Sequence, residues 1–274
     1  MRIVRFHTDS GPAYGSLTEG GSVHAISGDI FGDFAVGAKV ATVDDLRLLA
    51  PLDPPKVIGV GANYLEHIRE GGEDSAIPSF PMVFQLPSTA VIGPEDPIVL
   101  PRKDGFLHAV NHPELKREPF NPVEYEAELV VVIGKPCRDI QEAEALDYVL
   151  GYSCGNDVSA RALQTAEMAT GVLMLGKGLD TFKPLGPCIA TDLDPTELTV
   201  TARLNGTPTQ RASTSDLIFS VASLVTYLAQ AISMQPGDCI YTGTPSGGGS
   251  LEAGDTIEVE VSGVGVLRNP VVSA

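Results

Sequence analysis

The stretch Glu124-Tyr-Glu-Ala-Glu-Leu-Val-Val-Val-Ile-Gly134 joins an acidic start to a continuous Val-rich run. The run predicts a strand that enters the core. Residues i and i+2 of a strand lie on one face, so Glu126 and Glu128 are expected to point the same way. A Glu-x-Glu pair is also common on solvated strand faces, and the pair alone therefore does not establish a function.

A third carboxylate follows in Gly155-Asn-Asp-Val-Ser-Ala-Arg161. Asp157 comes after a second predicted strand, Tyr148 to Ser153, which places it close to the acidic pair. Three carboxylates form a typical oxygen site for a hard divalent cation, with positions left for water or substrate. The pattern predicts a metal enzyme.

Four further motifs surround these acids, and their order is informative. They are Asn63-Tyr-Leu-Glu-His67-Ile-Arg-Glu70, Asp157-x-x-x-Arg161-x-x-Gln164, Gly176-Lys177-Gly-Leu-Asp-Thr-Phe-Lys-Pro-Leu-Gly-Pro187 and Gly237-Asp-Cys-Ile-Tyr-Thr-Gly-Thr244-Pro-Ser-Gly-Gly.

From about Lys56 to its end, the chain resembles the fumarylacetoacetate hydrolase family, in the branch of acylpyruvate hydrolases and 2-hydroxyhepta-2,4-diene-1,7-dioate isomerases. The family's metal pattern falls here on Glu126, Glu128 and Asp157, and implies Mg²⁺ or Mn²⁺. The resemblance also implies a mixed α+β, mostly β fold, with a β-sandwich roll as catalytic domain behind a small N-terminal α+β domain. It further implies a homodimer.

His67 and Glu70 are expected to be neighbours on a short helix, for which Asn63 and Glu66 have capping-box spacing. A carboxylate beside an imidazole fixes the tautomer and raises the basicity, as a water-activating base requires. Taken alone, such a pair is more often solvated. In the family this segment resembles the lid over the substrate, so His67 and Glu70 are interpreted as the catalytic pair.

Three polar residues are interpreted as substrate-binding. Arg161 and Gln164 follow Asp157 on a predicted helix opening at Ser159, and a guanidinium suits a substrate carboxylate, although it would equally bridge to a surface acid. Thr244 lies in a Gly-rich turn that lacks the Lys of a phosphate-binding loop. It resembles the loop that cradles the substrate in the family. Lys177 resembles the family lysine that stabilises a developing enolate, so it joins the catalytic residues.

These residues predict a divalent-metal-dependent hydrolase that cleaves a carbon–carbon bond of an acylpyruvate-type diketo acid through an enolate. Two other reactions share that intermediate: decarboxylation of a β-keto acid such as oxaloacetate, and isomerisation of a dienol diacid. A homologue that binds a metal or ligand without turnover is the alternative of another class. The presence of His67, Glu70 and Lys177 argues against it.

Composition excludes several kinds of partner. The formal charge is −17, from 18 Lys and Arg against 35 Asp and Glu, so binding to nucleic acid or to a membrane surface is not expected. The N-terminus lacks the apolar core of a signal peptide, which predicts a cytoplasmic protein. Four widely spaced cysteines in apolar segments predict reduced core residues rather than a redox or zinc motif: Cys137, Cys154, Cys188 and Cys239.

The chain is expected to form two units, a small N-terminal domain over 1–52 and a catalytic domain over 53–274, because the Pro-rich stretch 50–55 cannot continue a helix. Thr42 and Asp45 predict the start of a helix, and apolar spacing predicts a long helix from about Ser215 to Ile232. Strands dominate the remainder. They are expected at 2–6, 13–17, 22–26, 57–61, 82–85, 98–100, 126–133, 148–153, 188–191, 198–204, 238–242 and 256–261.

Two features depart from the family pattern. The chain contains no Trp, and the stretch 169–175 ahead of the lysine motif is aliphatic, which predicts a more aliphatic pocket wall. The connection 101–123 is long. Loops of this length in compact domains are often functional, and its His108 and His112 are placed either at the mouth of the site or in a solvated or subunit-contact loop.

Overall fold

The computed structural model describes residues 1–72, 75–102 and 120–274. Within them strands predominate, which confirms the predicted mostly β fold. The strands are β1 (Arg2–Thr8), β2 (Gly11–Leu17), β3 (Ser22–Gly28), β4 (Phe34–Thr42), β5 (Leu48–Leu49), β6 (Val57–Gly61), β7 (Met82–Leu86), β8 (Val91–Ile92), β9 (Ile98–Leu100), β10 (Val123–Tyr125), β11 (Ala127–Ile133), β12 (Val149–Asn156), β13 (Ser159–Ala160), β14 (Lys183–Ala190), β15 (Thr199–Leu204), β16 (Thr207–Ser213), β17 (Cys239–Tyr241), β18 (Gly249–Ser250), β19 (Thr256–Val261) and β20 (Gly265–Ser273).

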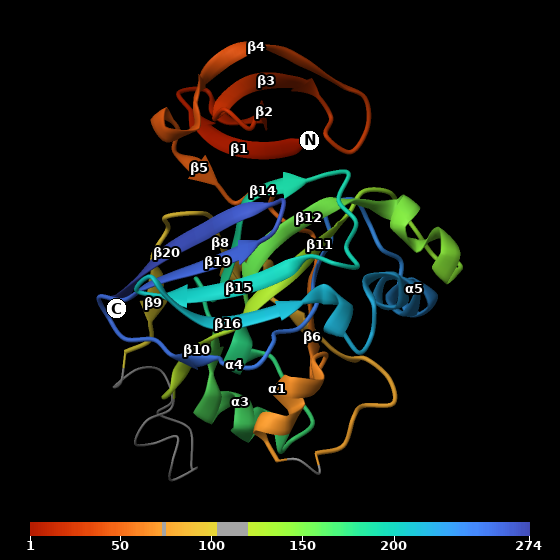
Figure 1. Ribbon diagram of the computed structural model, residues 1–274, viewed down its shortest axis with the longest axis vertical. Helices are drawn as coiled ribbons and strands as arrows, with labels where there is room; N and C mark the ends of the chain where they lie inside the picture. Colours follow the sequence, from red (N-terminus) through yellow and green to blue (C-terminus); the bar gives the residue numbers. More distant parts are fainter. Residues whose placement is uncertain (73–74, 103–119) are drawn as a thin grey trace.

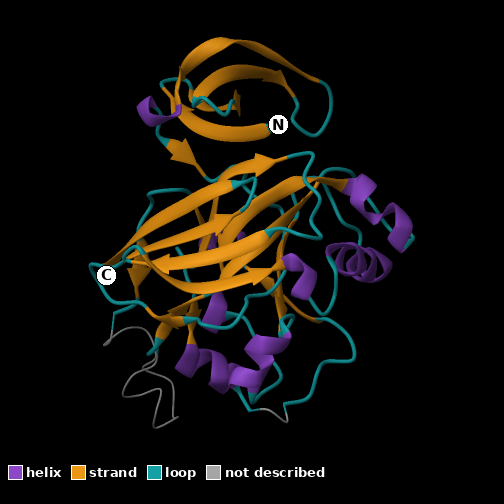
Figure 2. Cartoon of the chain, viewed as in Figure 1, coloured by secondary structure: helices purple, strands orange, loops and turns teal. Residues whose placement is uncertain are grey.

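The helices are short and lie at the edges of the strand layers (Figure 2). Helices α1, α3 and α4 gather at the end of the body opposite the N-terminal strands (Figure 1). None of the helices in the described ranges is long and apolar enough to cross a membrane. The helices are α1 (Leu65–Glu70), α3 (Arg161–Met168), α4 (Leu175–Gly178) and α5 (Val221–Ala231), and the 3-10 turns are η1 (Val43–Asp45), η2 (Ser88–Ala90), η3 (Glu142–Tyr148) and η4 (Thr214–Asp216).

Two large sheets form the body. The main path of the first runs β4-β3-β2-β1-β14-β12-β11-β17-β6-β7, and the second is ordered β16-β15-β19-β20-β9. Strands β11, β12 and β14 of the first sheet contact β15, β19 and β20 of the second, so the two sheets pack face to face. A small third sheet, β13-β10-β18, lies next to the acidic stretch.

Strand β11 is buried on both faces. Leu129 and Val131 belong to the core cluster between the sheets, whereas Val130 and Val132 belong to the cluster on the other face. A strand covered on both sides needs apolar residues at every position, which accounts for the continuous Val-rich run.

The N-terminal strands continue the first sheet. Strand β1 pairs antiparallel with β14 through Arg2↔Ala190 and Ile3↔Ile189. The backbone N–H of Thr191 also donates to the carbonyl of Met1 at 2.8 Å. The residues predicted as a separate unit are therefore joined to the body by backbone pairing.

Several predicted boundaries were wrong. Strand β11 begins at Ala127, β12 covers Val149–Asn156, and the helix predicted from Ser159 begins at Arg161. Strand β14 begins at Lys183, before the predicted 188, and eight strands were not predicted: β4, β5, β8, β10, β13, β16, β18 and β20. The Thr42 hydroxyl does donate to Asp45, but only the turn η1 follows.

The predicted helix from Ser215 begins instead at Val221, because Ser220 caps it by accepting from the N–H of Ser223 at 3.1 Å. The segment before Ser220 holds only the turn η4, which ends at Asp216, and Phe219 donates its N–H to the side chain of Asn63 at 2.8 Å. Asn63 is fully buried in this role, so it does not cap α1, whose N-cap is Tyr64.

The close approach of β12 to its neighbours gives a test of this packing. A Cβ on Gly155 would lie 2.5 Å from Cε1 of the fully buried Tyr241 and would also overlap Val130. We expect Gly155→Ala to lower the free energy of unfolding by about 1–3 kcal/mol through overpacking, measured by chemical denaturation.

Gly20→Ala is the matched control, since nothing lies within 4 Å of its Cβ position. It should change stability by less than about 0.5 kcal/mol. Equal stabilities of the two variants would contradict the described packing of β11, β12 and β17.

Candidate active site

Three buried carboxylates converge near the start of β11 and the end of β12. Glu126 lies between β10 and β11, Glu128 is in β11, and Asp157 follows β12. Each offers one oxygen within 4.8 Å of the others, and all three side chains are buried. The register pairs Glu128 with Gly155, which brings the end of β12 beside the acidic pair. The structure thus brings together the three predicted metal ligands.

Three cations balance this cluster. Lys177 Nζ lies 2.7 Å from Glu126 Oε2 and 2.7 Å from Asp157 Oδ2. Lys183 Nζ lies 2.6 Å from Asp157 Oδ1. Arg161 approaches the remaining oxygen of Glu126, with Nη2 2.5 Å from Oε1. Charge pairing of this kind is what permits ionised groups in a protein interior.

Arg161 is held more tightly by protein groups than the sequence predicted. Its Nε donates to Glu124 at 2.6 Å and its Nη1 donates to Gln164 at 2.8 Å. Together with Glu126, these partners use one N–H on each guanidinium nitrogen. Arg161 and Gln164 still line the cavity described below, so N–H groups remain for a ligand.

Glu128 has a different environment. Among residues 1–72, 75–102 and 120–274, no Lys, Arg or His side chain pairs with it; its Oε2 accepts the N–H of Gly243 at 2.8 Å. Gly243 has φ +104°, and a Cβ there would lie 2.8 Å from the Cβ of Asn63. Glycine is therefore needed for the backbone to reach this carboxylate.

The pKa values of Glu126 and Glu128 are shifted in opposite directions. Burial opposes ionisation of Glu126, but the ammonium of Lys177 and the guanidinium of Arg161 prevail and lower its pKa to about 2. Burial, followed by the charges of Asp157 and Glu126, raises the pKa of Glu128 well above its usual range. Burial also lowers the pKa of Lys183, against the opposing effect of Asp157.

The predicted catalytic pair is assembled. His67 Nδ1 lies 2.7 Å from Glu70 Oε2, and the other oxygen of Glu70 accepts the N–H of Gly247 at 2.7 Å. A carboxylate can only accept, so Nδ1 carries a hydrogen, and in the neutral imidazole Nε2 then keeps its lone pair. Nε2 has no hydrogen-bond partner among the described residues, and His67 lines the same cavity as Glu126 and Glu128.

Thr244 also lines this cavity, but its hydroxyl is occupied. It donates to the carbonyl of Ala127 at 3.0 Å and accepts from the buried Gln210 at 2.9 Å. The single hydroxyl hydrogen is thus used within the protein. Toward a ligand, the Thr244 side chain can accept a hydrogen bond but cannot donate one.

The cavity is about 270 Å³ in volume. Its apolar wall is mainly aliphatic among the described residues, as the lack of Trp predicted, and it includes Phe84, whose ring centroid lies 5.6 Å from Lys177 Nζ. The lining residues are Val60, Gly61, Ala62, His67, Ile68, Gly71, Met82, Phe84, Glu126, Glu128, Arg161, Gln164, Met168, Leu173, Lys177 and Thr244.

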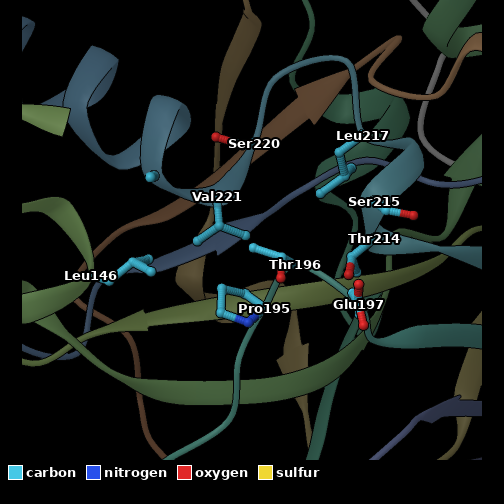
Figure 3. A pocket seen from close by; sticks show the side chains of 10 residues that line it. Leu146, Pro195, Thr196, Glu197, Thr214, Ser215, Leu217, Ser220 and Val221 are labelled. Carbon is cyan, nitrogen blue, oxygen red and sulfur yellow. The ribbon is translucent and has the colours of Figure 1, made fainter. Parts of the chain in front are cut away.

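A second cavity, about 380 Å³, lies beside the start of α5 (Figure 3). It is larger, but among the described residues Glu197 is its only ionisable lining residue, and the others carry hydroxyl or apolar side chains. Within the described part of the chain, neither a charged cluster nor a base faces it. The smaller cavity is therefore the candidate active site, because it combines a base, buried acids and cations.

Sequence analysis missed several residues of this site. Glu124 stands two positions before Glu126, so the same i, i+2 argument would have included it. Lys183 was visible as a lone Lys in an apolar strand. Gln210 gave no signal, because its role depends on contacts with Ala127 and Thr244 that are distant in sequence. His108 and His112 lie outside the described residues.

Comparison with known proteins identifies the family. Residues 56–272 match the family described as fumarylacetoacetate (FAA) hydrolase C-terminal, and residues 1–51 match the Rv2993c-like N-terminal family. The chain belongs to the fumarylacetoacetate hydrolase family.

Three known proteins illustrate the range of this similarity. The crystal structure of 5-carboxymethyl-2-hydroxymuconate delta-isomerase from Mycobacterium smegmatis is 40% identical, with a TM-score of 0.85 and 100% of both chains covered. A mitochondrial oxaloacetate tautomerase of Xenopus laevis is 36% identical over 83% of this chain and 69% of its own. Maleylpyruvate hydrolase from Sphingobium, solved with manganese(II) and pyruvate, is 28% identical, with a TM-score of 0.75 and both chains fully covered.

The residues present fit a divalent metal. Four carboxylates face three cations here. The carboxylates belong to Glu124, Glu126, Glu128 and Asp157, and the cations to Arg161, Lys177 and Lys183. Glu128 is the one carboxylate without a cationic partner in the described part of the chain. The donor atoms are all oxygens, which suits Mg²⁺ or Mn²⁺. Glu126, Glu128 and Asp157 would hold the ion.

The raised pKa of Glu128 predicts how metal binding depends on pH. Below that pKa the carboxyl is protonated, and a metal must displace the proton. We expect Mn²⁺ to bind more tightly as the pH rises and to release up to one proton from Glu128. Calorimetric titration in buffers of different ionisation enthalpy measures both quantities.

The thermal stability of the protein should also depend jointly on pH and on Mn²⁺. A carboxyl whose pKa is raised by folding favours the folded state at low pH, and this contribution is lost as the pH rises through the raised pKa. The gain in Tm on adding Mn²⁺ should therefore be larger at pH 8 than at pH 5.5. Glu128→Gln should remove this difference; a difference that persists in that variant would contradict the interpretation.

Proposed function

We propose that this protein is a divalent-metal-dependent hydrolase that cleaves a carbon–carbon bond of an acylpyruvate-type 2-oxo acid through an enolate. The observation that carries the proposal is that His67, with Nε2 unpartnered among the described residues, lines one cavity together with Glu126, Glu128 and Lys177. The site thus offers a base and a stabilising cation to a carbonyl compound bound in the cavity.

The chain's own residues account for the proton transfers. His67 Nε2 removes a proton from water, and the negative charge of Glu70 stabilises the imidazolium that forms. Glu70 is fixed for this role, because the N–H of Gly247 holds its second oxygen. The activated water adds to the distal carbonyl, the carbon–carbon bond breaks, and a carboxylic acid and an enolate result.

The enolate gains negative charge that the substrate lacked, so a cation placed beside it lowers the barrier instead of only tightening binding. Lys177 supplies a buried cation at this cavity. Arg161 and Gln164 orient the substrate carboxylate with their remaining N–H groups. A bound Mg²⁺ or Mn²⁺ would supply Lewis-acid polarisation of the vicinal oxygens.

A second candidate is isomerisation or tautomerisation of a 2-oxo or dienol diacid, without bond cleavage. Two similar proteins support it, the delta-isomerase at 40% identity and the oxaloacetate tautomerase at 36%. The same His67 would then move a proton between substrate atoms. Oxaloacetate decarboxylation uses the same enolate and is a further outcome that a product assay can detect.

A homodimer is also part of the proposal. Strand β7 ends the main path of the first sheet, and Phe80, Met82 and Val83 are exposed beside or on it. An apolar sheet edge of this kind is typical of an interface. Light scattering at micromolar concentration should give about twice 28.7 kDa; a monomer mass would contradict this part.

The test of the reaction is a product assay with acetylpyruvate, fumarylpyruvate and oxaloacetate in D₂O, followed by NMR, with Mg²⁺, Mn²⁺ or a chelator. Hydrolysis gives pyruvate and a carboxylic acid, whereas tautomerisation leaves the carbon skeleton intact and introduces deuterium. His67→Ala should lower hydrolysis by about 10²–10⁴-fold, while leaving Mn²⁺ affinity nearly unchanged.

His7→Ala is the matched control, because this imidazole is exposed on β1, far from the site in the fold, and should keep full activity. Hydrolysis that survives in His67→Ala would place the base elsewhere. Activity that persists after thorough chelation would overturn the metal dependence, and deuterium exchange without cleavage of any substrate would favour the second candidate.

A further inference from the structure

Lys183 is a buried lysine beside the acidic cluster, and it does not line the cavity. It begins β14, and its side chain is fully buried. Its Nζ donates to the carbonyl of Phe182 at 2.8 Å and to that of Val158 at 3.0 Å. Nζ also lies 2.6 Å from Asp157 Oδ1, an ion pair that does not have hydrogen-bond geometry.

The two oxygens of Asp157 therefore have different surroundings. Oδ1 faces the buried Lys183, whereas Oδ2 faces Lys177, which also contacts Glu126 Oε2. Oδ2 thus shares the ammonium of Lys177 with Glu126, whereas Oδ1 lies against Lys183, whose Nζ is also held by two backbone carbonyls.

The backbone at Lys183 is fixed as well. Lys183 pairs with Val91 of β8. The hydroxyl of the buried Tyr241 donates to the neighbouring carbonyl of Pro184 at 3.1 Å. Lys183 thus holds Asp157 from a rigid strand, which is the arrangement expected of a group that orients a ligand rather than touching substrate.

We infer that Lys183 is a positioning residue that acts through Asp157. It holds Oδ1, so that Asp157 binds a divalent cation through Oδ2 alone. It thereby limits the affinity of the acidic cluster for that cation. The inference rests on the metal site within the proposed function. It does not depend on which 2-oxo acid is the substrate.

The sign of the effect distinguishes this role from a structural one. Groups in the outer shell of a metal site typically change metal affinity by about 10–100-fold. A cationic partner withdraws charge from its carboxylate and repels the ion. Removing Lys183 should therefore tighten metal binding, whereas loss of mere structural support would weaken it.

The test uses Lys183→Met, which keeps the length and apolar stem of the side chain. Lys56→Met is the matched control, because Lys56 also forms a 2.6 Å ion pair with a fully buried carboxylate, Asp238. Asp238 precedes β17, whereas Gly243, which contacts the acidic cluster, follows that strand. Mn²⁺ affinity is measured without substrate, from the EPR signal of the free ion.

We expect Lys183→Met to bind Mn²⁺ at least about tenfold more tightly than the unaltered protein, and Lys56→Met to bind as the unaltered protein does. Unchanged or weaker binding by folded Lys183→Met would overturn the inference. Crystals of the Mn²⁺-loaded proteins should show Asp157 bound through Oδ2 alone in the unaltered protein and through both oxygens in the variant.

The crystal structure of the unaltered protein keeps the inference falsifiable even if Lys183→Met does not fold. Ligation through Oδ1, with Lys183 displaced, would overturn it while leaving the metal site intact. Failure of the unaltered protein to bind Mn²⁺ would instead remove the metal site itself, and with it this inference.

Discussion

The central constraint on this structure is the crowding of like charges in a low-dielectric interior. Glu126, Glu128 and Asp157 cannot all be ionised there without cations nearby. Lys177, Lys183 and Arg161 supply them, each from a different element: α4, β14 and α3. The three elements must meet at one place if the buried carboxylates are to be ionised there. Charge pairing therefore holds α3 and α4 together at the end of the body where α1 also lies (Figure 1).

The same constraint explains the unequal treatment of the carboxylates. Glu126 contacts two cations and is kept ionised, whereas Glu128 accepts the N–H of Gly243 and has no cationic partner in the described part of the chain. An unbalanced carboxylate costs stability, which a divalent ion would offset.

Sequence predicted the members of this site better than their contacts. The i, i+2 spacing of Glu126 and Glu128 is a local property of a strand, and His67 and Glu70 are neighbours on a helix. Such pairs follow from backbone geometry alone. Asn63 has the spacing of a cap, but its partners, Phe219 and Thr242, are more than 150 residues away. Tertiary hydrogen bonds outweighed the local preference at Asn63, whereas the start of α5 is set by the local cap Ser220.

Lys183 shows how the distant parts of the fold support the site. It begins β14, and the last residues of that strand pair with β1 at the N-terminus. The N-terminal strands therefore extend the sheet from which Lys183 projects. A strand held on both edges loses less entropy when it orients a side chain than a free strand would. Residues 1–51 are thus linked to Lys183, and through it to Asp157, by strand β14, although none of them lines the cavity.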